Sequence, residues 1–175
     1  MKRKLLSVFL SLAMVLTMMP VFAMADTSVG GGTPGAGSGS NVGASGINSY
    51  EALVKAISDA EDGDTITLAG DIDVTKTILV ENKTITLDLA GHRLYNSKDI
   101  WNDNDWSLIS VRGTADLTIL GEGELQAKEN DCYGVDVYDK TATVTIKEAN
   151  VIGNVHAVYV VEGTANIEGG NYSVQ

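Results

Sequence analysis

The sequence predicts an all-β solenoid, in which short strands stack in about four to five coils behind one amphipathic helix. Five short phrases alternate apolar, polar and apolar residues, the pattern of a strand with one buried face. Their central residues follow one another at intervals of 19, 32, 27 and 21 positions, a spacing typical of stacked repeats. Corners rich in glycine, asparagine and aspartate separate the phrases. The central residues are Thr67, Thr86, Thr118, Thr145 and Asn166.

Residues 1–25 are predicted to be a signal peptide. A basic head over residues 2–4 precedes an apolar stretch over residues 5–22, and Ala-Met-Ala then forms the small-x-small site that signal peptidases cut. An uncleaved anchor is the alternative, because about 18 apolar residues approach the length that spans a bilayer. The cleavage site favours a secreted or cell-surface protein that has no membrane span after cleavage.

The charge and the cysteine content exclude several functions. Cleavage would remove three of the 12 basic residues and none of the 23 acidic ones, so the formal net charge would change from −11 to 9 − 23 = −14. Such a protein is not drawn electrostatically to nucleic acid or to an anionic membrane. Cys132 is the only cysteine, so no intramolecular disulfide can form. We expect a buried thiol, because the two histidines, His92 and His156, lie in different repeats and offer no adjacent base.

Residues 26–47 are predicted to be a flexible linker, because they are almost all small or polar and cannot bury a core. The folded domain is predicted over residues 48–175. Asn48 and Glu51 have capping-box spacing, which predicts the start of a helix. Its apolar stripe would consist of Tyr50, Leu53, Val54 and Ile57. This helix would cover the otherwise open edge of the first coil.

Two further sets of strands keep step with the first. The second set lies six to eight residues after the later phrases and is centred on Leu94, Leu125, Ile152 and Tyr172. The third set begins at Ile78, Leu108, Val135 and Val158, and in each of its strands the first and third residues are predicted to point inward. The intervening residues would then form an outward column of Leu79, Ile109, Asp136 and Tyr159. Glycines at the corners after the first set suit a tight bend.

The interval of 32 residues contains a predicted loop over residues 96–106, which has no alternation. Asp99, Asp103 and Asp105 in this loop have the carboxylate oxygens that calcium binds, which is one alternative. They do not follow EF-hand spacing, so we expect a solvated acidic loop, with no metal or other cofactor. Trp101 and Trp106 would be costly on a fully solvated loop. They either fold back onto the coil or contact a partner, and the sequence leaves both alternatives open.

Three segments carry a resemblance to a known family. They are YEALVKAI over residues 50–57, DGDTITL over residues 62–68 and KTITLDLAGH over residues 83–92. They resemble the N-terminal cap and first coils of the pectate-lyase-like superfamily, in particular of large repeat-bearing surface proteins of Gram-positive bacteria. The resemblance covers about residues 48–175 and implies a right-handed parallel β-helix. It does not specify an activity, because enzymes, adhesins and structural stalks share this fold.

The third set of strands provides the candidate site. Tyrosine rings beside a carboxylate suit sugar binding, since the ring stacks on a pyranose while the carboxylate accepts hydroxyl groups. The predicted carbohydrate contacts are Asp136, Tyr138, His156 and Tyr159. The alternative is that they are ordinary exposed strand residues. Glu122 and Glu124 have the spacing of paired carboxylates, but they flank a glycine corner where acidic residues are common.

These observations predict a non-catalytic structural or adhesive module of a secreted or cell-surface protein. Its expected partner is extracellular polysaccharide or cell-wall glycan, bound weakly. The alternative is the N-terminal part of a polysaccharide lyase or glycoside hydrolase, whose catalytic coils would follow residue 175. The strand pattern is still running at Gln175, so we expect the β-helix to be incomplete there. Arg93 and Arg112 are the only arginines after the signal sequence, and neither lies opposite an acidic column, which favours the non-catalytic alternative.

Overall fold

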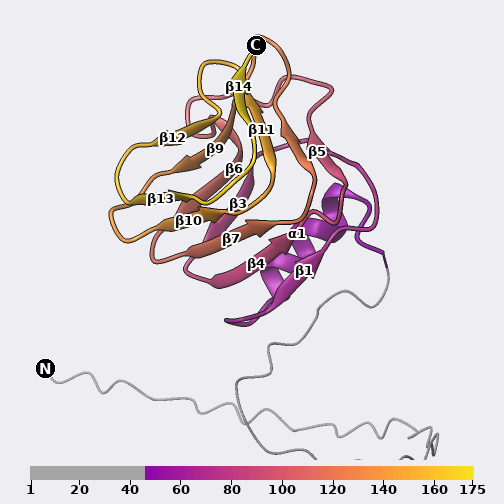
Figure 1. Ribbon diagram of the computed structural model, residues 1–175, viewed down its shortest axis with the longest axis vertical. Helices are drawn as coiled ribbons and strands as arrows, with labels where there is room; N and C mark the ends of the chain where they lie inside the picture. The colour runs from indigo at the N-terminus through magenta and orange to yellow at the C-terminus, as the bar shows by residue number, and fades with distance from the viewer. Residues whose placement is uncertain (1–45) are drawn as a thin grey trace, which may run out of the picture. The chain divides into compact units, whose positions relative to one another are not determined.

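The computed structural model describes residues 46–175 (Figure 1). The predicted signal peptide, residues 1–25, and nearly all of the predicted linker, residues 26–47, lie outside the described residues. Ile47 already belongs to the fold, because it is buried and forms a parallel bridge with Leu68. No helix of the described residues is long and apolar enough to cross a membrane.

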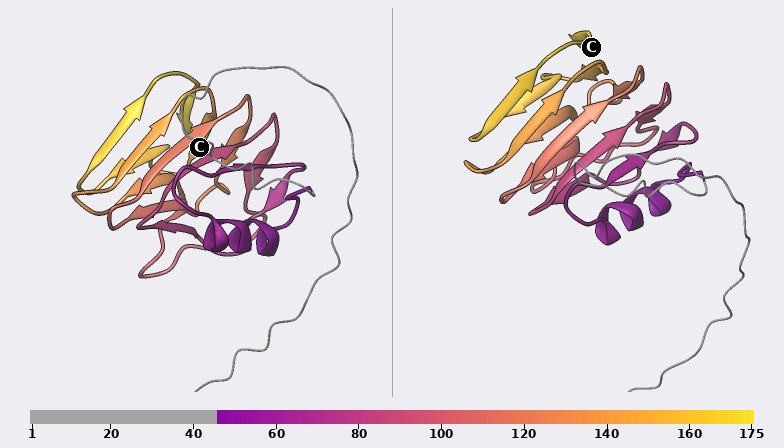
Figure 2. Two further views of the ribbon diagram at one scale, coloured as in Figure 1. Left: turned by 90° about the horizontal axis from the view of Figure 1, so that it is seen from below. Right: turned by 60° about the horizontal axis from the view of Figure 1, so that its bottom comes forward.

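Helix α1 (Tyr50–Asp59) precedes all the strands. Its N-cap is Ser49 rather than the predicted Asn48, and the Ser49 side chain accepts a hydrogen bond from the Ala52 amide at 3.2 Å. Leu53, Ala56 and Ile57 are its buried residues and belong to the hydrophobic core. Val54, predicted on the same stripe, is instead 38% exposed. The helix lies against the earliest strands (Figure 2).

Within residues 46–175, fourteen strands form three parallel sheets. The first sheet contains β1 (Thr65–Thr67), β4 (Thr84–Asp88), β7 (Asp116–Leu120), β10 (Thr143–Ile146) and β13 (Thr164–Ile167). The second contains β2 (Ile72–Asp73), β5 (Arg93–Tyr95), β8 (Glu124–Gln126), β11 (Asn150–Gly153) and β14 (Tyr172–Val174). The third contains β3 (Ile78–Glu81), β6 (Ser107–Arg112), β9 (Tyr133–Val137) and β12 (Val158–Val160). The predicted all-β architecture of stacked parallel strands is confirmed.

Among these fourteen strands, consecutive ones never pair with each other. Each pairs with the strand three places along the chain, so the chain visits the three sheets in turn and then repeats the circuit (Figures 1 and 2). Thr86, Thr118, Thr145 and Asn166 are aligned in neighbouring strands of the first sheet, as predicted. The first phrase is displaced, because Thr86 pairs with Thr65 and not with Thr67, which makes that interval 86 − 65 = 21 positions.

Apolar residues of all three sheets point into one core. In the second sheet Val151, and not Ile152, aligns with Leu125 and Tyr172, so the predicted second set is displaced by one residue in β11. Gly123 lies at the corner before β8, where an added Cβ atom would approach the His92 carbonyl oxygen to 2.5 Å. The two backbone segments pass so close to each other that this corner requires glycine.

The third sheet corrects the predicted outward column. Ile109 pairs with Ile78 and Val135 and is fully buried in the core, so its predicted outward position is wrong. Ser110 takes that place, because it pairs with Leu79 and Asp136. The outward column is therefore Leu79, Ser110, Asp136 and Tyr159. The error arose because Leu108 and Ile109 are both buried, which breaks the simple alternation at the start of β6.

Strands β12, β13 and β14 each lie at one end of their sheet. Val160 and Ile167 occupy the same columns as Val137 and Ile146, which are fully buried one coil earlier. In the last coil Val160 is 40% exposed and Ile167 is 51% exposed. The burial of these columns therefore depends on the coil stacked above them.

Candidate functional site

The outer side of the third sheet carries a continuous cluster of aromatic rings, which we call the aromatic face. It brings together three of the predicted contacts, Tyr138, His156 and Tyr159, and adds three residues that were not predicted as contacts. The six members are Trp101, Trp106, Tyr133, Tyr138, His156 and Tyr159. Both tryptophans of the chain belong to it.

Two neighbouring coils supply Tyr133, His156 and Tyr159. The rings of His156 and Tyr159 stack in near-parallel planes, with their centroids 5.0 Å apart. Tyr133 opens β9 in the preceding coil, and its centroid lies 5.0 Å from that of His156 and 5.3 Å from that of Tyr159. The Gly134 amide donates to the His156 carbonyl at 3.2 Å, so backbone pairing between the coils holds these rings beside one another.

The loop between β5 and β6 supplies the two tryptophans, and Tyr138 follows directly after β9. Trp101 and Tyr133 are nearly perpendicular, with their ring centroids 5.3 Å apart, and the Trp101 ring lies 6.3 Å from that of Trp106. Trp106 in turn lies 5.7 Å from Tyr138. The two tryptophans therefore fold back onto the coil, which is one of the two alternatives left open by the sequence. Trp101 remains 45% exposed and Tyr138 remains 40% exposed, so the cluster keeps an accessible apolar surface.

Asp131 fastens this loop to the sheet. Its carboxylate accepts hydrogen bonds from the Asn96 side chain at 2.8 Å, the Ile100 amide at 2.9 Å and the Trp101 amide at 3.2 Å. Asp131 is itself buried, which makes these charge-assisted bonds strong. One buried residue, 30 positions away in the chain, therefore sets the position of the Trp101 ring.

Arg112 fastens the other end of the loop. Its guanidinium donates to the Asn104 carbonyl at 2.9 Å and forms an ion pair with Asp105 at 3.4 Å. Its Nε donates to the Ser110 hydroxyl at 2.8 Å, and its Cζ lies 5.4 Å from the centre of the Tyr138 ring. Arg112 thus connects the loop, the outward column and the aromatic face.

Asp136 lies beneath the loop and the aromatic face. It occupies the outward column but is fully buried, so the expectation that it faces solvent is wrong. Its Oδ2 accepts a hydrogen bond from Ser110 at 3.1 Å, whereas its Oδ1 has no partner among the described residues. Burial raises the pKa of this carboxyl group, against the opposing effects of the hydrogen bond from Ser110, of the nearby Ser107 hydroxyl and of the Arg112 charge. Asp136 is therefore part of the floor of the site and not of its surface.

Two hollows open beside the aromatic face. The first hollow has a volume of about 450 Å³, and its lining includes Asp99, Trp101, Tyr133, Asn154 and Val155. The second hollow has a volume of about 360 Å³, and Trp101, Asp103, Trp106, Tyr133 and Tyr159 are among its lining residues. Trp101 and Tyr133 line both. Apolar rings edged by amides and carboxylates are the surface that a pyranose needs, with CH groups on one side and hydroxyl groups around its rim.

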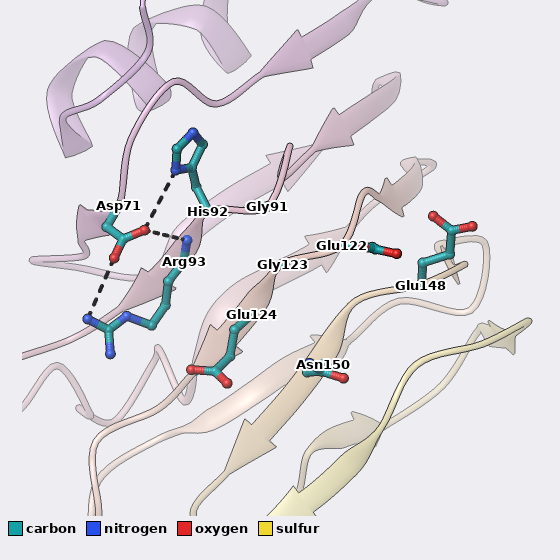
Figure 3. A pocket seen from close by; sticks show the side chains of 9 residues that line it. All are labelled: Asp71, Gly91, His92, Arg93, Glu122, Gly123, Glu124, Glu148 and Asn150. Atoms are coloured by element: carbon teal, nitrogen blue, oxygen red, sulfur yellow. Dashed lines mark hydrogen bonds and ion pairs between the residues drawn. The ribbon is translucent and has the colours of Figure 1, made fainter.

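A separate acidic hollow of about 550 Å³ lies at the corner between the first and second sheets. Glu122, Glu124 and Glu148 contribute to its lining (Figure 3). The Asp71 carboxylate lies 3.8 Å from the His92 ring nitrogen and 3.7 Å from the Arg93 guanidinium. Figure 3 shows the Glu124 and Glu148 side chains pointing in different directions. This corner therefore gathers acidic groups without converging them on one point.

The remaining predicted polar residues have other partners. Asp99 forms an ion pair with Lys128 at 2.7 Å, and Asp105 pairs with Arg112. No cluster of histidine, cysteine, aspartate and glutamate that could hold a metal ion occurs within residues 46–175. Cys132 is fully buried, and burial raises the pKa of its thiol, which keeps the group protonated at neutral pH.

Tyr133 is the central ring of the cluster, and it was missed in the sequence. A signal for it existed, because Tyr133 opens the third-sheet strand of its coil immediately before a glycine. Ser107 opens the preceding strand and pairs with it. Aligning the coils by these strand openings would have added Tyr133 to the candidate site.

Comparison with protein-family models, with curated proteins and with solved structures gave no match for this chain.

Proposed function

We propose that residues 46–175 form a right-handed parallel β-helix of the kind that the pectate-lyase-like resemblance implies. The support is the order of pairing, in which every strand pairs with the strand three places along the chain. Parallel crossovers of this kind are right-handed in nearly all proteins. In this proposal α1 closes the first coil, since Leu53, Ala56 and Ile57 extend the core at that end.

We propose further that the protein is a non-catalytic structural or adhesive module, secreted or held at the cell surface, that binds extracellular polysaccharide or cell-wall glycan. The observation that carries this proposal is the aromatic face with its two adjoining hollows. A location outside the cell rests on the predicted signal peptide, residues 1–25.

The scaffold suits this function. Ladders of parallel strands fix Tyr133 and Tyr159, and the Gly134 amide holds the His156 backbone. Asp131 and Arg112 hold the loop that carries the tryptophans. Rings that are already in place lose little conformational entropy when a ligand stacks on them. A surface of this kind binds weakly at each site, and repeated display along a polymer would raise the overall avidity.

Catalysis on polysaccharide is the second candidate, and the acidic hollow is the observation that favours it. Glycoside hydrolysis uses two carboxyl groups that flank the scissile bond. Release of reducing ends from neutral and acidic polysaccharides, and its loss in Glu124→Gln, would identify such an activity. Turnover that survives Glu124→Gln would remove the acidic hollow from consideration.

A glycan array probed with the purified protein tests the binding proposal. Trp101→Ala and Tyr159→Ala should each weaken binding of the retained glycans by about tenfold or more, because each removes a ring that stacks on the sugar. Tyr95→Ala is the matched control, since Tyr95 lies in β5 of the second sheet, away from the aromatic face. Equal loss in Tyr95→Ala, or no glycan retained at all, would contradict the proposal.

A further inference from the structure

The two hollows of the aromatic face share a wall. Trp101 and Tyr133 line both of them, and their rings meet edge to face at 5.3 Å. Asn154 and Val155 lie only on the first side, and Trp106 and Tyr159 lie only on the second. Each side therefore combines an aromatic surface with its own polar groups. A ligand of two or more linked rings would contact the shared pair from both sides.

The polar groups on both sides are uncharged or acidic. The first hollow is edged by Asp99, Asn130 and Asn154, and the second by Asn102 and Asp103. Amide and carboxylate oxygens accept hydrogen bonds from sugar hydroxyl groups, and amide nitrogens donate them. Asp131 also lines the first hollow, but its carboxylate already accepts hydrogen bonds from the Ile100 and Trp101 amides of the loop.

The basic side chains near the hollows, Lys128 and Arg112, already form ion pairs with aspartates. No lysine or arginine occurs among the described lining residues of either hollow. Lys128 lies beside the first hollow through its ion pair with Asp99 at 2.7 Å. Arg112 is held by Asp105, Asn104 and Ser110 beneath the loop. An anionic sugar would therefore meet carboxylates without a free cation, on a chain whose formal net charge is −11.

We propose that the aromatic face selects an uncharged, linear glycan, with neighbouring sugar rings placed in the two hollows on either side of Trp101 and Tyr133. This inference rests on the proposed function and adds to it the charge class and the minimum length of the ligand. A uronate-rich chain is excluded by charge, and a monosaccharide fills only one hollow.

Calorimetric titration with matched oligosaccharides tests this inference. The uncharged probes are glucose-, xylose- and mannose-based mono-, di- and tetrasaccharides, and the anionic probes are galacturonate oligomers of equal length. We expect at least one uncharged series to bind, with affinity rising about tenfold or more from the monosaccharide to the tetrasaccharide. At low salt the galacturonate tetramer should bind at least about tenfold more weakly than the uncharged tetrasaccharide, and added salt should narrow this difference in affinity.

Variants separate the two parts of the inference. Trp101→Ala should abolish the gain with length, because it removes the shared wall. Asp103→Lys should raise the affinity for the galacturonate tetramer, since it places a cation in the second hollow, while Asp103→Asn controls for loss of the aspartate. Asp103 is exposed, so neither change removes a core contact.

The outcomes are distinguishable. Preferential binding of galacturonate that is lost in Trp101→Ala would overturn the inference and leave the proposed function standing. Equal affinity for mono- and tetrasaccharides would overturn the two-hollow arrangement. Absence of binding to any glycan, in a protein whose circular dichroism is that of a β-rich fold, would overturn the inference together with the proposed function.

Discussion

Asp136 is the residue whose environment differs most from that of an ordinary strand residue. It pairs with Ser110 and Tyr159 in the outward column of the third sheet, where solvent is expected, yet it is fully buried. One of its oxygens has no partner among the described residues. Burying a carboxylate in this way is costly, so the protonated form is favoured.

The stability of the protein should therefore depend on the ionisation of Asp136. Its pKa is raised in the folded state, so the folded protein holds this proton over a pH range in which the unfolded chain releases it. The free energy of unfolding should fall as the pH rises from the unfolded value of about 3.9 through the folded one. Urea denaturation between acidic and neutral pH should show this fall in the wild type and a smaller fall in Asp136→Asn. Identical pH profiles would contradict the assignment.

The corrected orientation of β6 makes a second prediction. Ile109 is fully buried in the core, so Ile109→Ala should lower the free energy of unfolding by about 2–5 kcal/mol. Leu79, in the outward column, is 45% exposed, and Leu79→Ala should change the free energy of unfolding by less than about 1 kcal/mol. Chemical denaturation measures both. A loss in Ile109→Ala as small as that in Leu79→Ala would restore the outward position that the sequence suggested for Ile109.

At the scale of single elements, the loop between β5 and β6 determines the site. It contains both tryptophans, and its position depends on Asp131 in the next coil and on Arg112 at the end of β6. The sequence indicated a projecting loop because residues 96–106 lack alternation. It could not indicate the folded-back position, since the hydrogen bonds that decide it come from a residue about 30 positions later.

Removing the Asp131 carboxylate should release this loop. Asp131→Ala leaves three donors without their acceptor, at a cost of about 1–3 kcal/mol for each one that stays buried. Exchange of the Ile100 and Trp101 amides should then accelerate by about tenfold or more, and tryptophan emission should move to longer wavelength. Asp103→Ala, in the same loop but exposed, should change neither signal. Unchanged exchange in Asp131→Ala would mean that other contacts hold the loop.

At the scale of the whole molecule, periodicity made the scaffold predictable. Thr86, Thr118 and Thr145 lie in register because every coil places the same alternation over the same core. The errors occurred where the alternation stops, at the displaced first phrase and at Leu108 and Ile109. The aromatic face was only partly predictable, because its rings come from two coils and from an insertion that follows no repeat.

Binding at the aromatic face is the central claim, and the two tryptophans test it most directly, since the chain has only two and both lie there. Their indole N–H signals can be followed by nuclear magnetic resonance while a glycan retained on the array is added. Both signals should move with a single dissociation constant, and the shifts should be absent for a glycan that the array does not retain. Indole signals that stay fixed at saturation, while amides around the acidic hollow move, would contradict the claim.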